Sequence, residues 1–240
     1  MASLVSPPAS GNQRLHCRHR PAETVQQVER LSQLRRFLPP QLADVITSGG
    51  GDLLKSHGRE VTVLFCDLRG FTPFAERGEP EDVMAVLAEL HNNLGPLVFE
   101  HGGTLAQFHG DAMHVFFNDP VPCDAPARRA VALALGMRDR AEVLAIEWRR
   151  RGHELSLGVA AGYATCGRVG FEGRYEYTAI GTVTNLASRL CAEAKGGQVL
   201  ISQRVFTMLD GVVQADHLGD IEFKGIARRV PTYVVARLTD

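Results

Sequence analysis

The sequence has little that would place it in a membrane, on a nucleic acid or around a structural zinc ion. No apolar run approaches the roughly 18 residues of a membrane-spanning helix, and the first 20 residues lack the apolar stretch of a signal peptide. The formal net charge is -1, so no basic surface for nucleic acid is indicated. Five cysteines are scattered without a CxxC pair, which is typical of a reduced, cytoplasmic protein. We therefore expect no membrane, no nucleic-acid partner and a cytoplasmic location.

What the chain does have is apolar material for a core and a length that suits one large domain with an extension. It has 240 residues, 45% of them hydrophobic. Residues 1–23 are rich in Pro, Ser, Asn and Arg, which predicts a disordered tail. Residues 24–38 show helical periodicity, two prolines end it, and residues 41–46 predict a second short helix. We interpret 24–58 as a helical linker or dimerisation segment, either a coiled coil between subunits or a helix packed on the domain.

Residues 59–240 alternate between the periodicities of strands and helices and are interpreted as one catalytic domain. The order β-α-β-β-α-β with extra strands predicts an α+β fold. We expect a ferredoxin-like core in which helices cover a mixed, mainly antiparallel sheet. Helices are expected at 80–100, 125–150 and 183–194, and strands at 61–67, on both sides of a turn within 104–117, and at 155–164, 175–180, 199–202, 212–217, 220–224 and 231–236.

Two aspartates end predicted strands where a buried strand needs no charge. Asp67 closes the apolar run of VTVLFCDLRGFT, and Asp111 lies in the turn of the predicted hairpin. In a β-α-β-β layout the first strand and the hairpin are neighbours, so we expect the two carboxylates to lie close together. Either aspartate alone is ordinary turn chemistry. The pair offers the oxygen ligands that Mg²⁺ prefers, with phosphates and water completing the octahedron.

Two further features carry polar side chains that bear on phosphate chemistry. In YTAIGTVTNLASRL, Asn185 and Arg189 are four residues apart on a predicted helix and project from one face. An amide and a guanidinium side by side can hold a ribose and a charged phosphorane, although a solvated helix face often has the same composition. Lys224 lies in EFKG between a strand and a turn, where it alone indicates only a surface charge.

These segments together resemble the catalytic domain of class III nucleotidyl cyclases. The resemblance rests on VTVLFCDLRGFT, GGTLAQFHGDAMHVFF, YTAIGTVTNLASRL and EFKG, in the family's order and spacing between about residues 59 and 237. It implies formation of a 3′,5′-cyclic nucleotide from the triphosphate, release of pyrophosphate, and two Mg²⁺ or Mn²⁺ ions per site. It also implies a site between two catalytic domains, hence a homodimer with two equivalent sites and an inactive monomer.

The resemblance assigns roles to particular side chains. Asp67 and Asp111 match the metal ligands, and Asn185 matches the residue that orients the ribose. Arg189 matches the residue that stabilises charge on the α-phosphate, and Lys224 matches a contact to the polyphosphate. The protein mostly positions groups and neutralises charge in such a reaction, so no strong side-chain base is needed.

The two positions that select the purine hold Gln107 and Thr178. Adenylyl cyclases of the family commonly have lysine at the first, while threonine at the second lies within the family's range. A glutamine amide can donate to adenine or flip and accept from guanine, and losing a charged donor costs about 1–2 kcal/mol of recognition. We therefore predict an adenylate cyclase that takes ATP with reduced selectivity over GTP. The nearby His109 and His114 are expected to face solvent.

Two alternatives to an active cyclase stay open. The first is a weak or degenerate cyclase-like domain that binds nucleotide or acts as a regulatory heterodimer partner; the filled metal and transition-state positions argue against it. The second is another two-metal enzyme on a related core, such as a diguanylate cyclase or a polymerase. The absence of a GGDEF motif and of a basic channel argues against that second class.

Overall fold

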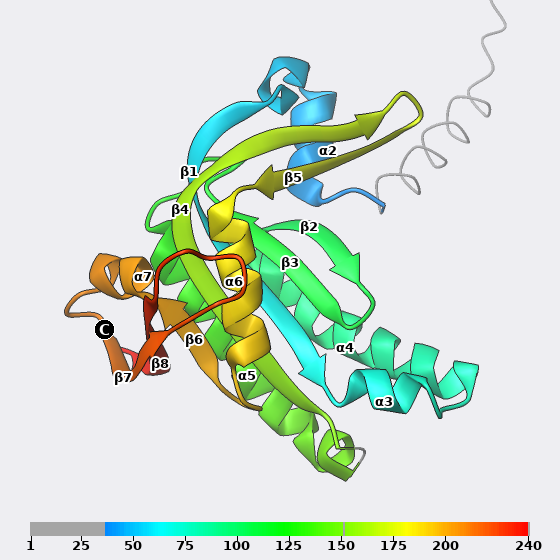
Figure 1. Cartoon of the computed structure of the whole chain (residues 1–240). Coiled ribbons are helices and arrows are strands. Elements are labelled where there is room, and N and C mark those ends of the chain that lie inside the picture. The colour runs from blue at the N-terminus through cyan, green and yellow to red at the C-terminus, as the bar shows by residue number, and fades with distance from the viewer. Residues whose placement is uncertain (1–36, 151, 240) are drawn as a thin grey trace, which may run out of the picture. The chain divides into compact units, whose positions relative to one another are not determined.

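A computed structural model describes residues 37–150 and 152–239, and its centre is an eight-stranded sheet (Figure 1). The strands follow the order β2-β3-β1-β4-β6-β8-β7, and β5 pairs with β4 outside this path. Every pair is antiparallel except β4 with β6. The bounds are His57–Arg69 (β1), Thr104–His109 (β2), Ala112–Phe117 (β3), Glu154–Phe171 (β4), Arg174–Ile180 (β5), Val199–Ser202 (β6), Val213–Ile221 (β7) and Val230–Leu238 (β8).

Helices cover both faces of this sheet (Figure 1). On one face α4 and α5 pack against the larger hydrophobic cluster, and on the other α6 and α2 pack against a second cluster. With β1 to β4, the helices α4 and α5 make the βαββαβ core, so the predicted α+β fold is confirmed. The helix bounds are Pro40–Thr47 (α2), Gly51–Leu54 (η1, a 3₁₀ turn), Phe71–Ala75 (α3), Pro80–Glu100 (α4), Pro126–Arg150 (α5), Thr182–Glu193 (α6) and Gln203–Met208 (α7).

The continuous apolar run of β1 is explained by these two layers. Val61 and Val63 point into the cluster under α6, whereas Leu64 and Cys66 belong to the cluster under α4 and α5. All four side chains are completely buried. A strand that is covered on both faces has a continuous apolar run instead of alternating residues. The apolar run at 61–67 therefore predicted the strand, although β1 extends beyond the run at both ends.

Several elements differ from the prediction. β1 extends from His57 to Arg69, because it pairs with β4 without a break from His57–Cys166 to Arg69–Glu154. β4 continues to Phe171, because its second part pairs with β5 as far as Phe171–Arg174. The two strands expected at 212–217 and 220–224 form one strand, β7, with an irregularity between His217 and Gly219. Between the strands expected at 199–202 and 212–217, where no helix was predicted, the structure has the helix α7.

The segment before the sheet is described from residue 37 onward. The helix predicted at 24–38 lies almost wholly outside the described residues, as does the tail at 1–23. The second predicted helix is present as α2, and its Leu42 and Val45 join the hydrophobic cluster under α6. In this region the segment packs on the domain, while the proposed domain limits remain predictions. None of the described helices is long and apolar enough to cross a membrane.

Candidate active site

Asp67 and Asp111 come together at the ends of two neighbouring strands. β1 pairs with β3 through Cys66 and Met113, so the residue after Cys66 lies beside the hairpin turn that precedes β3. The backbone N–H of Leu68 donates to Oδ2 of Asp111 at 3.3 Å. Both aspartates line one cavity of about 300 Å³, together with residues 68–73 and Ala192. The proximity expected from the β-α-β-β order is therefore present.

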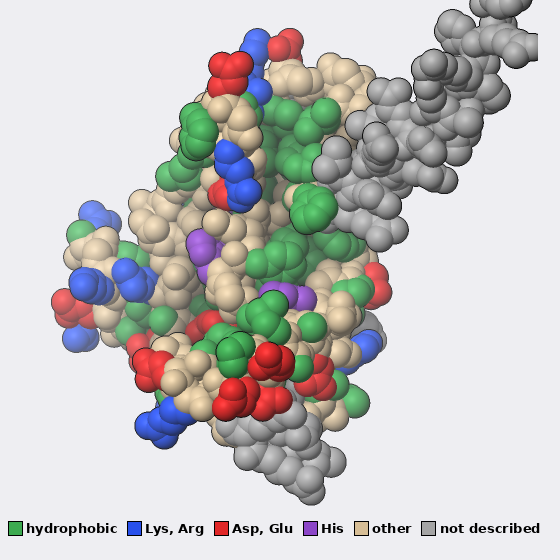
Figure 2. All heavy atoms as spheres, turned by 90° about the vertical axis from the view of Figure 1, so that its right-hand side faces the viewer, with side chains coloured by type: hydrophobic (Ala, Val, Ile, Leu, Met, Phe, Trp, Pro, Cys, Tyr) green, Lys and Arg blue, Asp and Glu red, His purple; other side chains and the backbone are tan. Residues whose placement is uncertain are grey.

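The two carboxylates disturb each other electrostatically. Burial raises the pKa of Asp111 to about 6, and the negative charge of Asp67 adds to that rise. Glu76, Glu79 and Glu81, from the end of α3 to the start of α4, are exposed. Figure 2 shows acidic side chains gathered in the lower part of one face of the molecule. A cavity with an excess of negative charge and hard oxygen ligands fits a divalent cation such as Mg²⁺. The described residues gather no third His, Cys, Asp or Glu there.

The wall of this cavity depends on one glycine and one arginine that follow Asp67. Gly70 has φ +81°, and a Cβ on it would lie 2.4 Å from the carbonyl oxygen of Gly152, so only glycine fits this bend between β1 and α3. Arg69 donates from Nη2 to the carbonyl of Ala192 at 2.5 Å. Its Nε is buried and finds no partner in the described part of the chain. Arg69 thus joins the cavity to the last turn of α6.

Asn185 and Arg189 lie on one exposed face of α6, as predicted. The opposite face, with Val183, Ala187 and Leu190, is buried on the sheet. The helix lies unusually close to β4. A Cβ added to Gly158 on β4 would lie 2.2 Å from the backbone nitrogen of Cys191 on α6, so this close approach requires glycine. Neither Asn185 nor Arg189 uses its side chain in a hydrogen bond or ion pair with a described residue. Both side chains are accordingly available to a ligand.

The two positions predicted to select the purine lie on strands that approach each other. Gln107 is on β2 and Thr178 on β5; both are half-buried, and the two strands are in contact. Lys224 is exposed in the connection between β7 and β8, next to the buried Phe223. Of the seven predicted site residues, only Asp67 and Asp111 line the aspartate cavity. Gln107, Thr178, Lys224, Asn185 and Arg189 do not line it. Within one chain, the seven predicted site residues therefore do not form a single pocket.

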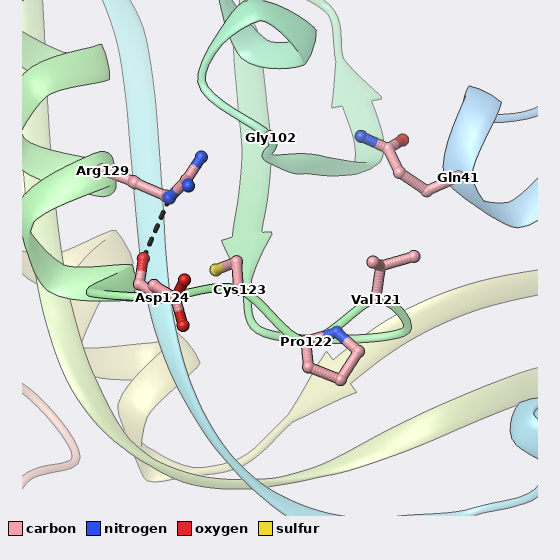
Figure 3. Close-up of a pocket in the computed structure, with 7 residues that line it drawn as sticks. All are labelled: Gln41, Gly102, Val121, Pro122, Cys123, Asp124 and Arg129. Carbon is pink, nitrogen blue, oxygen red and sulfur yellow. Dashed lines mark hydrogen bonds between the residues drawn. The ribbon is translucent and has the colours of Figure 1, made fainter.

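A larger cavity, of about 390 Å³, lies between α2 and the start of α5 (Figure 3). Gln41 reaches from α2 and donates to the carbonyl oxygen of Gly103 at 2.8 Å. On the far side Nε of Arg129 donates to the carbonyl oxygen of Asp124 at 2.9 Å. None of the predicted site residues lines this cavity.

Comparison with protein families decides the identity of the domain. Residues 54–237 match the adenylate and guanylate cyclase catalytic domain. The chain belongs to the class III nucleotidyl cyclase family. The resemblance drawn from the four sequence motifs is thereby confirmed, and the second alternative, another two-metal enzyme on a related core, is set aside.

Individual relatives of this cyclase domain include two bacterial adenylate cyclases. Adenylate cyclase 1 of Rhizobium meliloti is 35% identical over 182 residues, which cover 74% of this chain and 27% of that protein. The adenylate cyclase of Anabaena cylindrica is 28% identical over 183 residues, covering 73% of this chain and 36% of that protein. The chain thus spans about a third or less of the length of these relatives.

Solved structures agree with the fold of the cyclase domain. The adenylyl cyclase CyaB of P. aeruginosa is 35% identical with a TM-score of 0.73, over 77% of this chain and 97% of that one. The guanylyl cyclase Cya2 is 28% identical with a TM-score of 0.72, over 77% of this chain and 95% of that one. Because both an adenylyl and a guanylyl cyclase match so well, the fold does not choose the purine.

The cyclase domain also contains residues that the sequence did not single out correctly. His114 is 5% exposed and stacks on Phe65, with ring centroids 4.6 Å apart, so the expectation that it faces solvent is wrong. Burial lowers its pKa to about 4, which keeps it neutral. His109 is exposed, as expected. Arg69, which lines the cavity with the two aspartates, was not singled out, although its place two residues after Asp67 was a usable signal.

Proposed function

We propose that this domain is an adenylate cyclase that converts ATP to 3′,5′-cyclic AMP and pyrophosphate in a homodimer. The observation that carries the proposal is the pairing of Asp67 and Asp111 in one negatively charged cavity. The family match and the 35% identity to an adenylate cyclase place the chemistry in the right class. GTP is expected as a poorer, secondary substrate.

Asp67 and Asp111 would hold two Mg²⁺ or Mn²⁺ ions. Bound there, the ions supply the Lewis acidity that activates the 3′-hydroxyl and neutralises the leaving pyrophosphate. The pKa of Asp111, raised by burial and further by the charge of Asp67, supports this role, since a bound cation would stabilise both carboxylates in their charged form. With only two carboxylates gathered by the described residues, other ligand positions are left to backbone carbonyls, water and the triphosphate.

Asn185, Arg189 and Lys224 would act on the substrate of the partner's aspartate cavity. The 3′-oxygen must attack the α-phosphorus in line, so the ribose has to be held in one orientation. The amide of Asn185 would fix the ribose, and the guanidinium of Arg189 would face the charge that grows on the α-phosphate. Lys224 would contact the polyphosphate. All three are exposed, as residues that complete a site on another chain must be.

A homodimer explains why one chain does not gather these residues in one pocket. A twofold axis would place the α6 face of each chain over the aspartate cavity of the other, which gives two equivalent sites. Large apolar side chains are exposed on β2 and on the β4–β5 hairpin, including Tyr163 and Phe171, both 71% exposed. Hydrophobic side chains reach the surface on the side seen in Figure 2. Exposed apolar area of this kind marks interaction surfaces.

Mixing two inactive variants tests both the chemistry and the assembly. Asp111→Asn removes a metal ligand and Arg189→Ala removes the transition-state cation, so each homodimer should make no cyclic AMP. Their equal mixture forms heterodimers in half of the pairs, each with one intact site, and should regain roughly a quarter of the wild-type rate. Formation of cyclic AMP and cyclic GMP would be measured in Mg²⁺ and in Mn²⁺.

Three outcomes would change the proposal. A mixture that stays inactive, although the two variants form dimers as the wild type does, contradicts the shared site. The aspartates and the α6 residues would then have to act within the same chain. A wild-type protein that prefers GTP corrects the substrate. A dimeric wild-type protein that makes neither product supports the degenerate, nucleotide-binding alternative.

A further inference from the structure

One buried carboxylate, Asp119, connects three separate segments of the domain. It lies in the segment between β3 and α5 and is 2% exposed. Its Oδ2 lies 2.7 Å from Nε2 of His57, and its Oδ1 accepts a hydrogen bond from the hydroxyl of Tyr177. Its backbone carbonyl accepts a hydrogen bond from Oγ1 of Thr104 at 2.8 Å. A buried charge with this many partners fixes the groups around it.

The partners of Asp119 lie on the two strands that carry the purine-selecting positions. Tyr177 immediately precedes Thr178 on β5. Thr104 begins β2, three residues before Gln107. β2 and β5 are not hydrogen-bonded to each other in the sheet, since β2 pairs with β3 and β5 with β4. Asp119 is therefore a direct hydrogen-bonded bridge between these two strands.

We propose that Asp119 is a positioning residue for purine recognition: it holds β5 through Tyr177 and β2 through Thr104, and so sets the spacing between Gln107 and Thr178. The proposal rests on the proposed function, because it deepens the role of those two positions. Two groups that read the edge of one base must keep their separation within a fraction of an ångström. Asp119 touches neither substrate nor metal and acts only through its neighbours.

His57 supplies the positive charge that makes this buried carboxylate tolerable. Nδ1 of His57 lies 2.8 Å from the carbonyl oxygen of Lys55, which can only accept, so Nδ1 carries a hydrogen. Nε2 faces the carboxylate of Asp119, so both ring nitrogens donate and the ring is an imidazolium. The hydrogen bond to Lys55 and then that to Asp119 raise the pKa of His57 above its usual value. The bridge is therefore complete in the protonated state of His57.

Other titratable groups near His57 leave this conclusion intact. Arg59, two residues along β1, lowers the pKa of His57, but less than Lys55 and Asp119 raise it. Cys166 is the partner of His57 across the β1–β4 ladder, and burial raises its pKa to about 12. Tyr177 has its pKa raised by burial and by Asp119, so it stays a hydrogen-bond donor. The Lys55 ammonium pairs with Asp52 at the surface.

The test compares nucleotide selectivity in Tyr177→Phe, Thr104→Val and Asp119→Asn with that of a control, Thr232→Val. Thr232 is buried on β8 and donates from its hydroxyl to Val230, so the control loses a similar hydrogen bond far from the purine positions. We expect Tyr177→Phe to raise the KM for ATP about fivefold with little change in kcat, and to lower the preference for ATP over GTP. The control should leave that preference unchanged.

A pH profile adds a readout that lost stability would not move. As pH rises through the pKa of His57, the imidazolium is lost, and the KM for ATP should rise with it. In His57→Gln this step should vanish while the KM stays at a constant, elevated value. If the profile of His57→Gln follows that of the wild type, the coupling through Asp119 is refuted.

Binding of 3′-deoxy-ATP and 3′-deoxy-GTP, which lack the attacking hydroxyl, separates this inference from the proposed function. A wild type that binds both analogues but forms no cyclic nucleotide from ATP or GTP contradicts the proposed activity and still lets the selectivity ratio of binding be measured. A ratio that is equal in wild type, Tyr177→Phe and Asp119→Asn overturns the inference. A wild type that binds neither nucleotide overturns both.

Discussion

Replacing Asp111 by asparagine should make the metal-free protein more stable while abolishing its activity. The carboxyl of Asp111 is half-buried beside Asp67, and these two causes raise its pKa from 3.8 to about 6. The folded state thus holds this proton more tightly than the unfolded chain does. Stability that is fully present below about pH 4 is then lost as the pH rises through about 6. An asparagine keeps the neutral form at every pH.

The size of the effect follows from that pKa difference. A shift of about two units corresponds to roughly 3 kcal/mol if it is taken in full. Asp111 is partly exposed, so solvent screening reduces the value to about 1 kcal/mol. For a chain of this length, such a gain raises the melting temperature by roughly 2–4 °C.

Thermal unfolding in a chelator at pH 5 and pH 8 measures this gain. Asp111→Asn should melt above the wild type at pH 8, with a smaller difference at pH 5, and Mg²⁺ or Mn²⁺ should stabilise only the wild type. Asp210→Asn, an exposed aspartate after α7, is the matched control; it should melt like the wild type at both pH values and keep the stabilisation by Mg²⁺ or Mn²⁺. Equal melting temperatures of Asp111→Asn and wild type at pH 8 would refute the view that the paired carboxylates repel each other in the empty cavity.

Three further changes have defined outcomes. Gln107→Lys restores a charged donor and should lower the KM for ATP about 5- to 30-fold without a gain for GTP; unchanged steady-state kinetics would show that Gln107 does not face the purine. Gly158→Ala places a Cβ 2.2 Å from the backbone nitrogen of Cys191 and should cost at least about 2 kcal/mol in urea unfolding, whereas Gly51→Ala, whose Cβ meets nothing within 4 Å, should not. Burial holds His114 neutral with a pKa of about 4, so the free energy of unfolding should fall as the pH drops from about 6.5 toward 4. Urea titrations should show a smaller fall in His114→Leu and an unchanged fall in His109→Leu, because His109 is exposed.

Local patterns in the sequence predicted the helices α2, α4, α5 and α6 and the proximity of Asp67 and Asp111, but not the short helices α3 and α7. α4 has the predicted bounds, because a proline begins it and two glycines follow it. The proximity of Asp67 and Asp111 followed from strand order alone, since a β-α-β-β unit places its first strand beside the hairpin. The face shared by Asn185 and Arg189 followed from helical periodicity.

Features set by distant partners were beyond a reading of local patterns. The ends of β1 and β4 depend on how far each strand finds the other, so polar residues such as Arg59 and Glu60 became part of a strand. His114 is buried because Phe65 on the neighbouring strand stacks on it. The partners of Asp119 lie 62 residues before and 58 residues after it, and no periodicity connects such positions.

The unbroken pairing of β1 with β4 has a mechanical consequence. β1 extends from His57, next to the entering segment, to Arg69, just past Asp67, and every residue between them has a partner on β4. At about 3.3 Å per residue, β1 spans roughly 40 Å, and its continuous pairing with β4 makes it resistant to bending. A push or twist applied at its first residues would reach the far end as a displacement of the whole strand, with little loss to bending. A regulatory segment that binds the first residues of β1 would therefore act on the aspartate cavity at the other end of the strand.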